Sequence, residues 1–309
     1  MLLGLGSALV AAVMYGVGSI MQARASREIP EGGLTPGTVI GLLRQPLLLA
    51  SILLLLLGYV FHLVSVRHVP LFLAQTGIAV SLVVTALLAV RYFGDRLSRL
   101  EWGAIVAVVA GLVLLSASAG ETGTERATPA LTTSLFVVLA LIVVVVFFAT
   151  RFEGALAAAV LGLAGGMGYA IVAIASRLLP DFVIADLITS ASTYALVASG
   201  VLAFFIYSLA LQRGSVTAAT TSLITTQTIA PTIAGVAFLG DEVREGYWPL
   251  FVVGFLLTAV AAAVLVRFEG IGDPVREADD DADPTHPTHP THPAGPGSST
   301  SSAGAAKGE

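Results

Sequence analysis

Nine long stretches of mainly apolar residues, each long enough to form a membrane-crossing helix, occupy most of this chain. A helix needs roughly 20 such residues to cross the hydrocarbon core of a bilayer. The stretches are residues 2–26, 46–68, 70–92, 99–119, 131–150, 153–178, 186–212, 215–240 and 247–267. Each run is continuous and does not alternate over short segments, so a membrane β-barrel is excluded. The sequence therefore predicts an all-α, polytopic membrane protein of about nine transmembrane helices.

The composition agrees with this prediction and excludes several classes of protein. Only 11% of the 309 residues are charged, against about a quarter in a soluble domain. The mean hydropathy is +0.91. These values argue against a water-soluble enzyme and against a nucleic-acid-binding protein. The chain contains no cysteine, so disulfides, thiol catalysis and cysteine-bound metals are excluded as well.

The distribution of positive charge predicts the orientation in the membrane. With the N-terminus outside, eleven of the fifteen lysines and arginines fall on the cytoplasmic side and four on the outside. Because cytoplasmic loops collect positive charge, we expect a multi-pass protein of the plasma (inner) membrane, with the N-terminus outside and the C-terminus in the cytoplasm. The first stretch is expected to be retained, since its first positive charges, Arg24 and Arg27, follow the apolar run.

An internal repeat is visible when the sequence is shifted against itself. A shift of 146 positions pairs Arg67 with Arg213, Gly94-Asp95 with Gly240-Asp241, and Trp102 with Trp248, and a shift of 154 pairs Tyr15 with Tyr169. Stretches 1–4 thus correspond to stretches 6–9, with the fifth between them. The odd number of crossings makes the halves inverted copies, an arrangement typical of alternating-access transporters. The alternative is that apolar helices align by composition alone.

The repeat predicts four parts of the chain. Residues 1–119 form the first transmembrane repeat, 120–152 a linker with the central fifth helix, 153–268 the second repeat, and 269–309 a disordered cytoplasmic tail. The tail carries Pro-Thr-His triplets at 284–292. In an extended polyproline helix successive histidines stand roughly 9 Å apart, too far to be adjacent ligands of one zinc ion.

The paired motifs resemble those of a known family. Gly94-Asp95-Arg96-Leu97 with Trp102, Gly103 and Gly111, and the second copy formed by Pro231, Gly240-Asp241 and Trp248, resemble the signature of the drug/metabolite transporter superfamily (EamA-like). The nine-span layout resembles the magnesium-transporter-like (NIPA-type) branch, which implies magnesium or another cation as an alternative substrate. That branch carries an acidic residue in its second span, where this chain reads Gly58-Tyr59-Val60-Phe61. This departure argues against magnesium.

Few residues inside the stretches offer transport chemistry. Apart from the tyrosines, His62 is the only ionisable side chain well inside a stretch, and such residues in a membrane are functional candidates. The alternative is a neutral histidine bonded to a neighbouring helix. Tyr15 and Tyr169 lie near mid-span, where a phenol needs a hydrogen-bond partner. They are equally compatible with lining a pathway and with a core position.

The eighth stretch is the most polar. Thr217, Thr221, Thr225, Thr228 and Thr232 share one helical face beside Gln227. Pro231 frees a backbone carbonyl near Gln227. Such a face favours a hydrated pathway, whereas the alternative is that the threonines bond to carbonyls of their own helix.

Three further sets complete the prediction for the stretches. In the third stretch, the counterpart of the threonine face is a less regular stripe formed by Gln75, Thr76, Ser81 and Thr85. Asp186, Thr189, Ser190 and Thr193 are expected on one face of the seventh, near its outer end. This face is compatible with an outer vestibule, and the favoured alternative is that Asp186 caps the helix in water. Small residues at Gly4, Ala8, Ala12 and Gly16, and at Gly162 and Gly166, are expected to allow close helix packing.

We therefore expect a secondary transporter or exporter of a small polar or amphipathic metabolite. The alternatives are a cation transporter and a non-transporting membrane subunit, and an enzyme is not expected. The candidate pathway residues are Tyr15, His62, Gln75, Thr76, Ser81, Tyr169, Thr221, Thr225, Gln227, Thr228 and Pro231. No cofactor or metal is expected. The expected partners are a small-molecule substrate and the lipid bilayer, with a homodimer as an open alternative and no nucleic acid.

Overall fold

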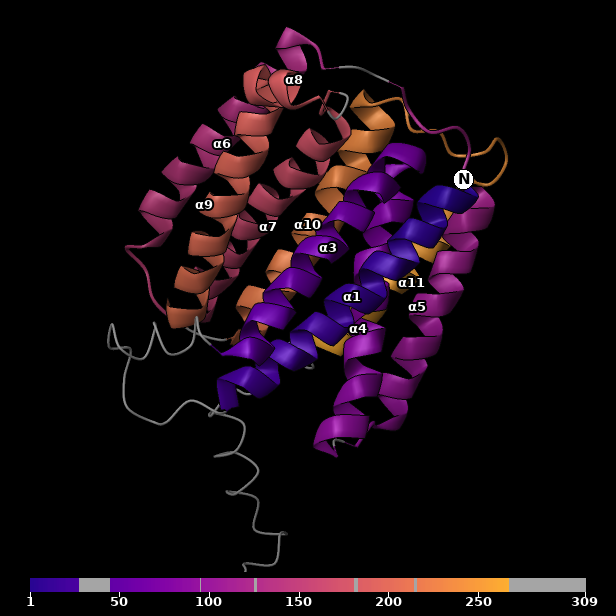
Figure 1. Ribbon diagram of the computed structural model, residues 1–309, viewed down its shortest axis with the longest axis vertical. Coiled ribbons are helices and arrows are strands. Elements are labelled where there is room, and N and C mark those ends of the chain that lie inside the picture. The colour runs from indigo at the N-terminus through magenta and orange to yellow at the C-terminus, as the bar shows by residue number, and fades with distance from the viewer. Residues whose placement is uncertain (28–44, 95, 125–126, 181–182, 214–215, 267–309) are drawn as a thin grey trace, which may run out of the picture. The chain divides into compact units, whose positions relative to one another are not determined.

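Long apolar segments satisfy their backbone hydrogen bonds internally as helices, and helices dominate this structure (Figure 1). The computed structural model describes residues 1–27, 45–94, 96–124, 127–180, 183–213 and 216–266. Its helices are α1 (Leu2–Arg27), α3 (Pro46–His68), α4 (Leu71–Phe93), α5 (Arg99–Ser118), α6 (Pro129–Ala149), α7 (Ala155–Arg177), α8 (Ile184–Thr189), α9 (Ala191–Arg213), α10 (Val216–Phe238) and α11 (Trp248–Leu265). Within these ranges, β-pairing is limited to an isolated bridge between Ala119 and Val243.

Eight helices of the described part are long and apolar enough to cross a membrane: α1, α3, α4, α5, α6, α7, α9 and α11. The prediction of a multi-pass, all-α membrane protein is confirmed at this level. Helix α10 has 23 residues, as many as α4, but is not among the eight. Its threonines and Gln227 lower its hydropathy, so length and composition alone do not establish the ninth predicted span.

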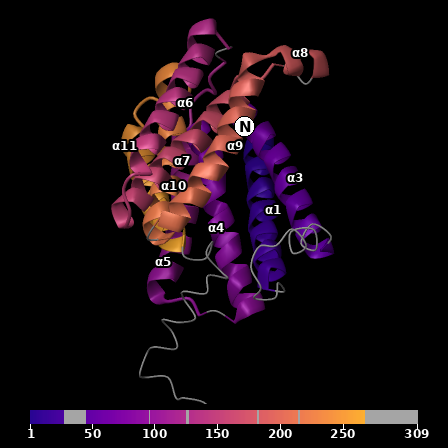
Figure 2. The ribbon, with the colours of Figure 1, turned by 90° about the vertical axis from the view of Figure 1, so that its left-hand side faces the viewer.

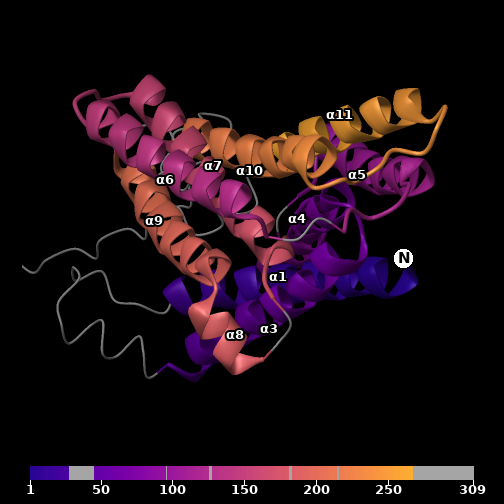
Figure 3. The ribbon, with the colours of Figure 1, turned by 90° about the horizontal axis from the view of Figure 1, so that it is seen from above.

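The helices pack in two similar sets. Helix α1 packs against α3 and α4, and α7 packs in the same way against α9 and α10. Helices α5 and α11 pack against each other (Figure 3). The order α1, α3, α4, α5 therefore matches the order α7, α9, α10, α11 in packing partners as well as in sequence motifs. Helix α6, which joins the sets along the chain, is the least buried of the apolar helices.

Two contacts bring the start of a helix in the first set beside the end of a helix in the second. Gly4 in the first turn of α1 lies against Val69, and Arg177 in the last turn of α7 donates to the Val69 carbonyl oxygen at 2.6 Å. The start of α1 therefore lies beside the end of α7. Likewise, the backbone amide of Leu71, which begins α4, donates to Asp241, which follows the end of α10. The start of α4 therefore lies beside the end of α10.

Small residues allow the close contacts of α1, as the sequence predicted. Ala8 faces Gly77, and Gly16 faces Val84, so that α1 lies directly against α4. Ala12 between them is fully buried.

Helix α7 approaches α10 by the same means. A side chain on Gly162 would collide with the backbone of Ala219, and one on Gly166 with the backbone of Leu223. The predicted packing role of both small-residue stripes is confirmed.

The seventh stretch departs from the prediction of one continuous helix over 186–212. Helix α8 ends at Thr189, Ser190 is extended (φ −77°, ψ 127°), and α9 begins at Ala191. Figure 2 shows α8 as a short separate helix before the start of α9. Because the chain turns at Ser190, Asp186 and Thr193 do not share the helical face that their spacing predicted. The predicted tail (269–309) lies outside the described residues.

The contact of α7 with α10 predicts a specific sensitivity at Gly162. We expect Gly162→Ala to lower the free energy of unfolding by about 1–3 kcal/mol, the usual cost of overpacking, because the new methyl group forces α7 away from Ala219. Thermal unfolding of the detergent-purified protein measures the change.

Gly103→Ala is the matched control. Gly103 lies in α5, and an added methyl group there meets no neighbouring atom. Replacing a helical glycine by alanine in open space is expected to stabilise the protein by about 0.5–1 kcal/mol. Equal effects of the two substitutions would contradict the close α7–α10 contact.

Candidate functional site

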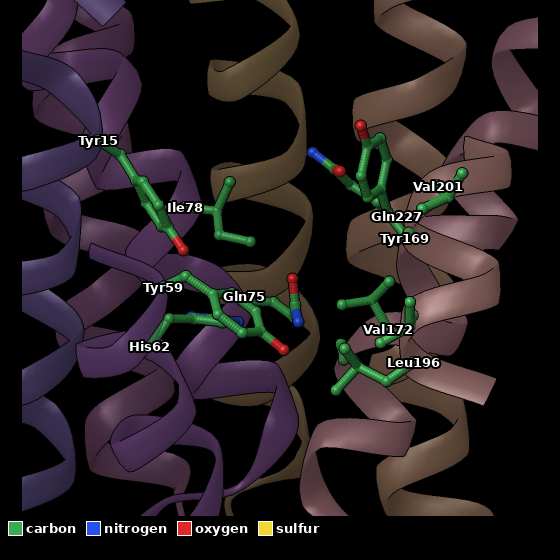
Figure 4. Close-up of a pocket in the computed structure, with 13 residues that line it drawn as sticks. Tyr15, Tyr59, His62, Gln75, Ile78, Tyr169, Val172, Leu196, Val201 and Gln227 are labelled. Carbon is green, nitrogen blue, oxygen red and sulfur yellow. The ribbon is translucent and has the colours of Figure 1, made fainter. Parts of the chain in front are cut away.

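A cavity of about 470 Å³ lies between the two sets of helices (Figure 4). It is called the central cavity below. Its lining comes from α1, α3 and α4 of the first set and α7, α9 and α10 of the second. The lining residues are Tyr15, Tyr59, His62, Gln75, Ile78, Tyr169, Val172, Ala173, Leu196, Val197, Gly200, Val201 and Gln227.

The structure brings five of the eleven candidate pathway residues together around this cavity. They are Tyr15, His62, Gln75, Tyr169 and Gln227. They come from five different helices, so the fold gathers polar groups that are up to 212 positions apart in sequence. The Tyr15 and His62 rings lie 6.5 Å apart between centroids, tilted by 55°. This cluster supplies phenol, imidazole and carboxamide groups to one space.

Tyr59 belongs to the same cluster and was not among the candidates. Its hydroxyl shares a hydrogen bond of 2.9 Å with Ser176 Oγ, which connects α3 to α7. Ser176 also donates to the Val172 carbonyl oxygen at 2.7 Å. The signal in the sequence was its spacing: Tyr59 precedes His62 by three residues and therefore shares its helical face.

Gln75 is the most deeply buried polar residue of the lining. It is 2% exposed, and its Nε2 atom has no hydrogen-bond partner within the described structure. Most buried polar groups in proteins are bonded, and each exception needs an explanation. Figure 4 shows the Gln75 side chain between the Tyr59–His62 side of the cavity and the Val172–Leu196 side.

The two hydroxyl candidates on the same helix as Gln75 donate hydrogen bonds to carbonyl oxygens of that helix. Thr76 donates to the Phe72 carbonyl oxygen at 2.8 Å, and Ser81 to that of Ile78 at 2.6 Å. Neither residue lines the central cavity. These bonds agree with the alternative in which such hydroxyls bond within the helix.

The threonine face of α10 behaves in the same way. Thr228 donates to the Ile224 carbonyl oxygen and Thr232 to that of Thr228, each at 2.8 Å. Thr221, Thr225 and Pro231 also lie outside the cavity lining, to which α10 contributes Gln227. Their predicted place on a substrate pathway stays a prediction.

The rest of the cavity wall is apolar. Ile78 of α4 and the α7–α9 residues Val172, Ala173, Leu196, Val197 and Val201 supply it. The thirteen lining residues include no Asp, Glu, Lys or Arg. Within the described part of the chain, no three His, Asp or Glu side chains gather as a metal site. The cavity thus combines hydrogen-bonding groups with apolar surface and no fixed charge.

A buried ion pair stands close to one end of the cavity. Arg177 Nη1 and Asp241 Oδ1 are 3.2 Å apart, and the two side chains are 5% and 0% exposed. Gly123 donates its amide to Asp241 Oδ1 at 3.0 Å and accepts from Arg177 Nη1 at 3.1 Å. With Val69 and Leu71, these residues form what is called the Arg177–Asp241 cluster below.

Helix ends stabilise both charges of the cluster. The amide of Leu71 at the start of α4 donates to Asp241 Oδ2 at 2.7 Å, and helix N-termini favour negative charge. Arg177 lies in the last turn of α7 and bonds the carbonyl at the end of α3, both of which favour positive charge. The cluster therefore joins both sets of helices at one end.

The backbone near Asp241 is shaped to admit its carboxylate. Gly240 after α10 has φ 73°, a conformation that favours glycine. Gly235 leaves room for the carboxylate, since a Cβ atom there would lie 2.5 Å from Asp241 Oδ2. The second copy of the sequence motif thus has a structural role that its spacing alone did not reveal.

The other motif residues occupy corresponding places. Gly94 ends α4 with φ 76°, as Gly240 does after α10. Trp102 near the start of α5 and Trp248 at the start of α11 are both about half exposed. Asp95 lies outside the described residues.

Comparison with known proteins adds no assignment: no family model, no curated protein and no solved structure matches this chain.

The ion pair predicts a large cost for removing one partner. We expect Asp241→Ala to lower the free energy of unfolding by about 3–5 kcal/mol, because Arg177 then stays buried without a counter-charge. Chemical denaturation in mild detergent measures the loss. Glu242→Ala removes an exposed carboxylate one position away and is expected to change stability by about 0.5 kcal/mol or less.

A double-variant cycle tests whether the two residues act as a pair. If Arg177→Ala and Asp241→Ala reduced stability additively when combined, the coupling inferred from the 3.2 Å contact would be contradicted.

Proposed function

We propose that this chain is a secondary transporter or exporter of a small polar or amphipathic metabolite that works by alternating access. The proposal includes membership of the drug/metabolite transporter superfamily, with the nine-span layout of its magnesium-transporter-like branch. The observation that carries it is the central cavity, because its polar lining is drawn from both sets of helices. Transporters built from inverted repeats hold their substrate at such an interface.

The proposal takes α10 as the ninth span. Its hydroxyls at Thr226, Thr228 and Thr232 bond to carbonyls of the same helix, which lowers the cost of placing them in a membrane. It packs against α7 along the small-residue stripe. Helices α1, α3, α4 and α5 then form one repeat, and α7, α9, α10 and α11 form its inverted copy.

In this mechanism the Arg177–Asp241 cluster is the gate on the outer side. Ser176, which bonds Tyr59 of the cavity lining, directly precedes Arg177. Gln75 lies one helical turn after Leu71, whose backbone amide donates a hydrogen bond to Asp241. Separating the ends of α3 and α4 from those of α7 and α10 would open the cavity at that end, and closing it requires the ion pair to form again.

The orientation follows from the excess of positive charge on one side. We propose a location in the plasma (inner) membrane, with the N-terminus and the Arg177–Asp241 cluster outside and the C-terminus in the cytoplasm. Only a minority of the lysines and arginines, four of fifteen, then lies outside.

Single cysteines test this topology, since the natural chain has none. We expect Glu121→Cys and Glu245→Cys to react with a membrane-impermeant thiol reagent in intact cells, because both residues are exposed and lie near the proposed outer end. The exposed Glu153→Cys should react only after permeabilisation. Labelling of Glu153→Cys and Glu245→Cys from the same side would show that α7, α9 and α10 do not all cross the membrane.

The cation-transporter alternative has less support in the cavity. Magnesium in proteins is usually held by one or two carboxylates with several retained waters, and the thirteen lining residues supply none. No feature of the described residues favours a non-transporting membrane subunit or an intramembrane enzyme. We propose transport without a protein-bound cofactor.

Solute flux tests the function directly. Proteoliposomes should take up at least one member of a metabolite panel saturably, with or without a pH gradient. Gly200 lines the cavity, and a Cβ atom added there makes only ordinary van der Waals contact. Gly200→Trp therefore places an indole in the cavity and is expected to lower that flux by at least about tenfold. Val106→Trp, on the exposed face of α5, is the control and should transport normally.

Two outcomes would contradict the proposal. Saturable magnesium flux without metabolite flux would favour the cation transporter, and equal flux of the Gly200 and Val106 variants would move the pathway away from the central cavity.

A further inference from the structure

We infer that the central cavity selects uncharged amphipathic solutes, which accept a hydrogen bond from Gln75 and place an apolar group against the α7–α9 wall. This inference rests on the proposed transport function and specifies its substrate class.

The first support is the unpartnered amide of Gln75. The residue is 2% exposed, lines the cavity, and has no hydrogen-bond partner for Nε2 among the described residues. A buried donor without a partner is destabilising. An acceptor on a ligand, such as a carbonyl or an amide oxygen, removes that penalty. Gln75 therefore favours the ligand-bound cavity over the empty one.

The second support is the wall opposite Gln75. Figure 4 shows Val172, Leu196 and Val201 together on the α7–α9 side. Their branched side chains, with Val197 and Ala173, give this side of the cavity apolar surface that gains by contact with an apolar group. The volume of about 470 Å³ lies within the range of small-molecule pockets. A ligand with one hydrogen-bonding end and one branched or cyclic end matches both walls.

The third support is the absence of a charged side chain among the thirteen lining residues. A solute with a net charge would leave water without meeting a counter-charge, and that desolvation is expensive in a protein interior. The faces of Tyr15, Tyr59 and Tyr169 attract cations, but the gain is smaller than the cost of desolvating an ion. The nearest ion pair, Arg177–Asp241, is already neutralised within its own cluster. Uncharged solutes are therefore preferred over both cations and anions.

Three probes with the same leucine side chain test this selection. N-acetyl-leucinamide is uncharged, N-acetyl-leucine is an anion, and leucinamide at pH 6.5 is a cation. Binding to the full-length protein in detergent is measured by calorimetry. We expect N-acetyl-leucinamide to bind at least about tenfold more tightly than either charged probe, since only the charged probes leave an ion unpaired in the cavity.

Gln75→Met tests the hydrogen bond with little change of shape. It is expected to weaken binding of the uncharged probe by about five- to tenfold, which corresponds to the loss of one neutral hydrogen bond. Gln212→Met makes the same change at an exposed position of α9 outside the cavity and should leave binding unchanged. If Gln75→Met does not fold, the comparison of the three probes on the natural chain decides.

The possible results separate this inference from the proposed function. Equal or tighter binding of a charged probe, no binding of the uncharged probe, or an unchanged affinity in Gln75→Met would each overturn the inference. If the uncharged probe binds selectively but no panel solute crosses proteoliposomes, the selectivity stands and the transport proposal fails.

Discussion

The burial of Arg177 and Asp241 against each other is the interaction on which the arrangement around the cavity depends. Each charge alone would cost several kcal/mol to remove from water. Together they satisfy each other and the free amide and carbonyl groups at the ends of α3 and α4. The contact therefore holds together the ends of α3, α7 and α10 and the start of α4.

On either side of the cavity, the helices of each set pack closely. Small residues bring α1 against α4 and α7 against α10. Between the two closely packed pairs, larger side chains such as Tyr15, Tyr59 and Tyr169 extend into the space that remains. Small residues thus account for the tight contacts within each set, whereas larger polar and apolar side chains line the cavity between the sets.

The helical fold could be predicted from the length and apolar character of the stretches, because a bilayer admits few other structures for apolar segments. The break between α8 and α9 at Ser190 was not predicted, because no proline or glycine stands there in the sequence. For the site, polar residues within the apolar stretches, such as His62, Gln75 and Gln227, pointed to the cavity. The threonines of α10 were less informative, because hydroxyls can bond within their own helix. The pairing of Arg177 with Asp241 depends on a contact across 64 positions, which one sequence does not reveal.

Helix α4 connects the ion pair to the cavity in a direct mechanical sense. Its first amide is held by Asp241, and Gln75 follows one turn later, about 6 Å along the axis. Both positions lie in the first turn and a half of one helix, so a shift of Gln75 toward a bound solute would be felt at the Leu71 amide, which donates a hydrogen bond to Asp241. In the proposed mechanism, occupancy of the cavity and closure of the cluster would therefore act on the same turn of α4, without a signal relayed through the rest of the protein.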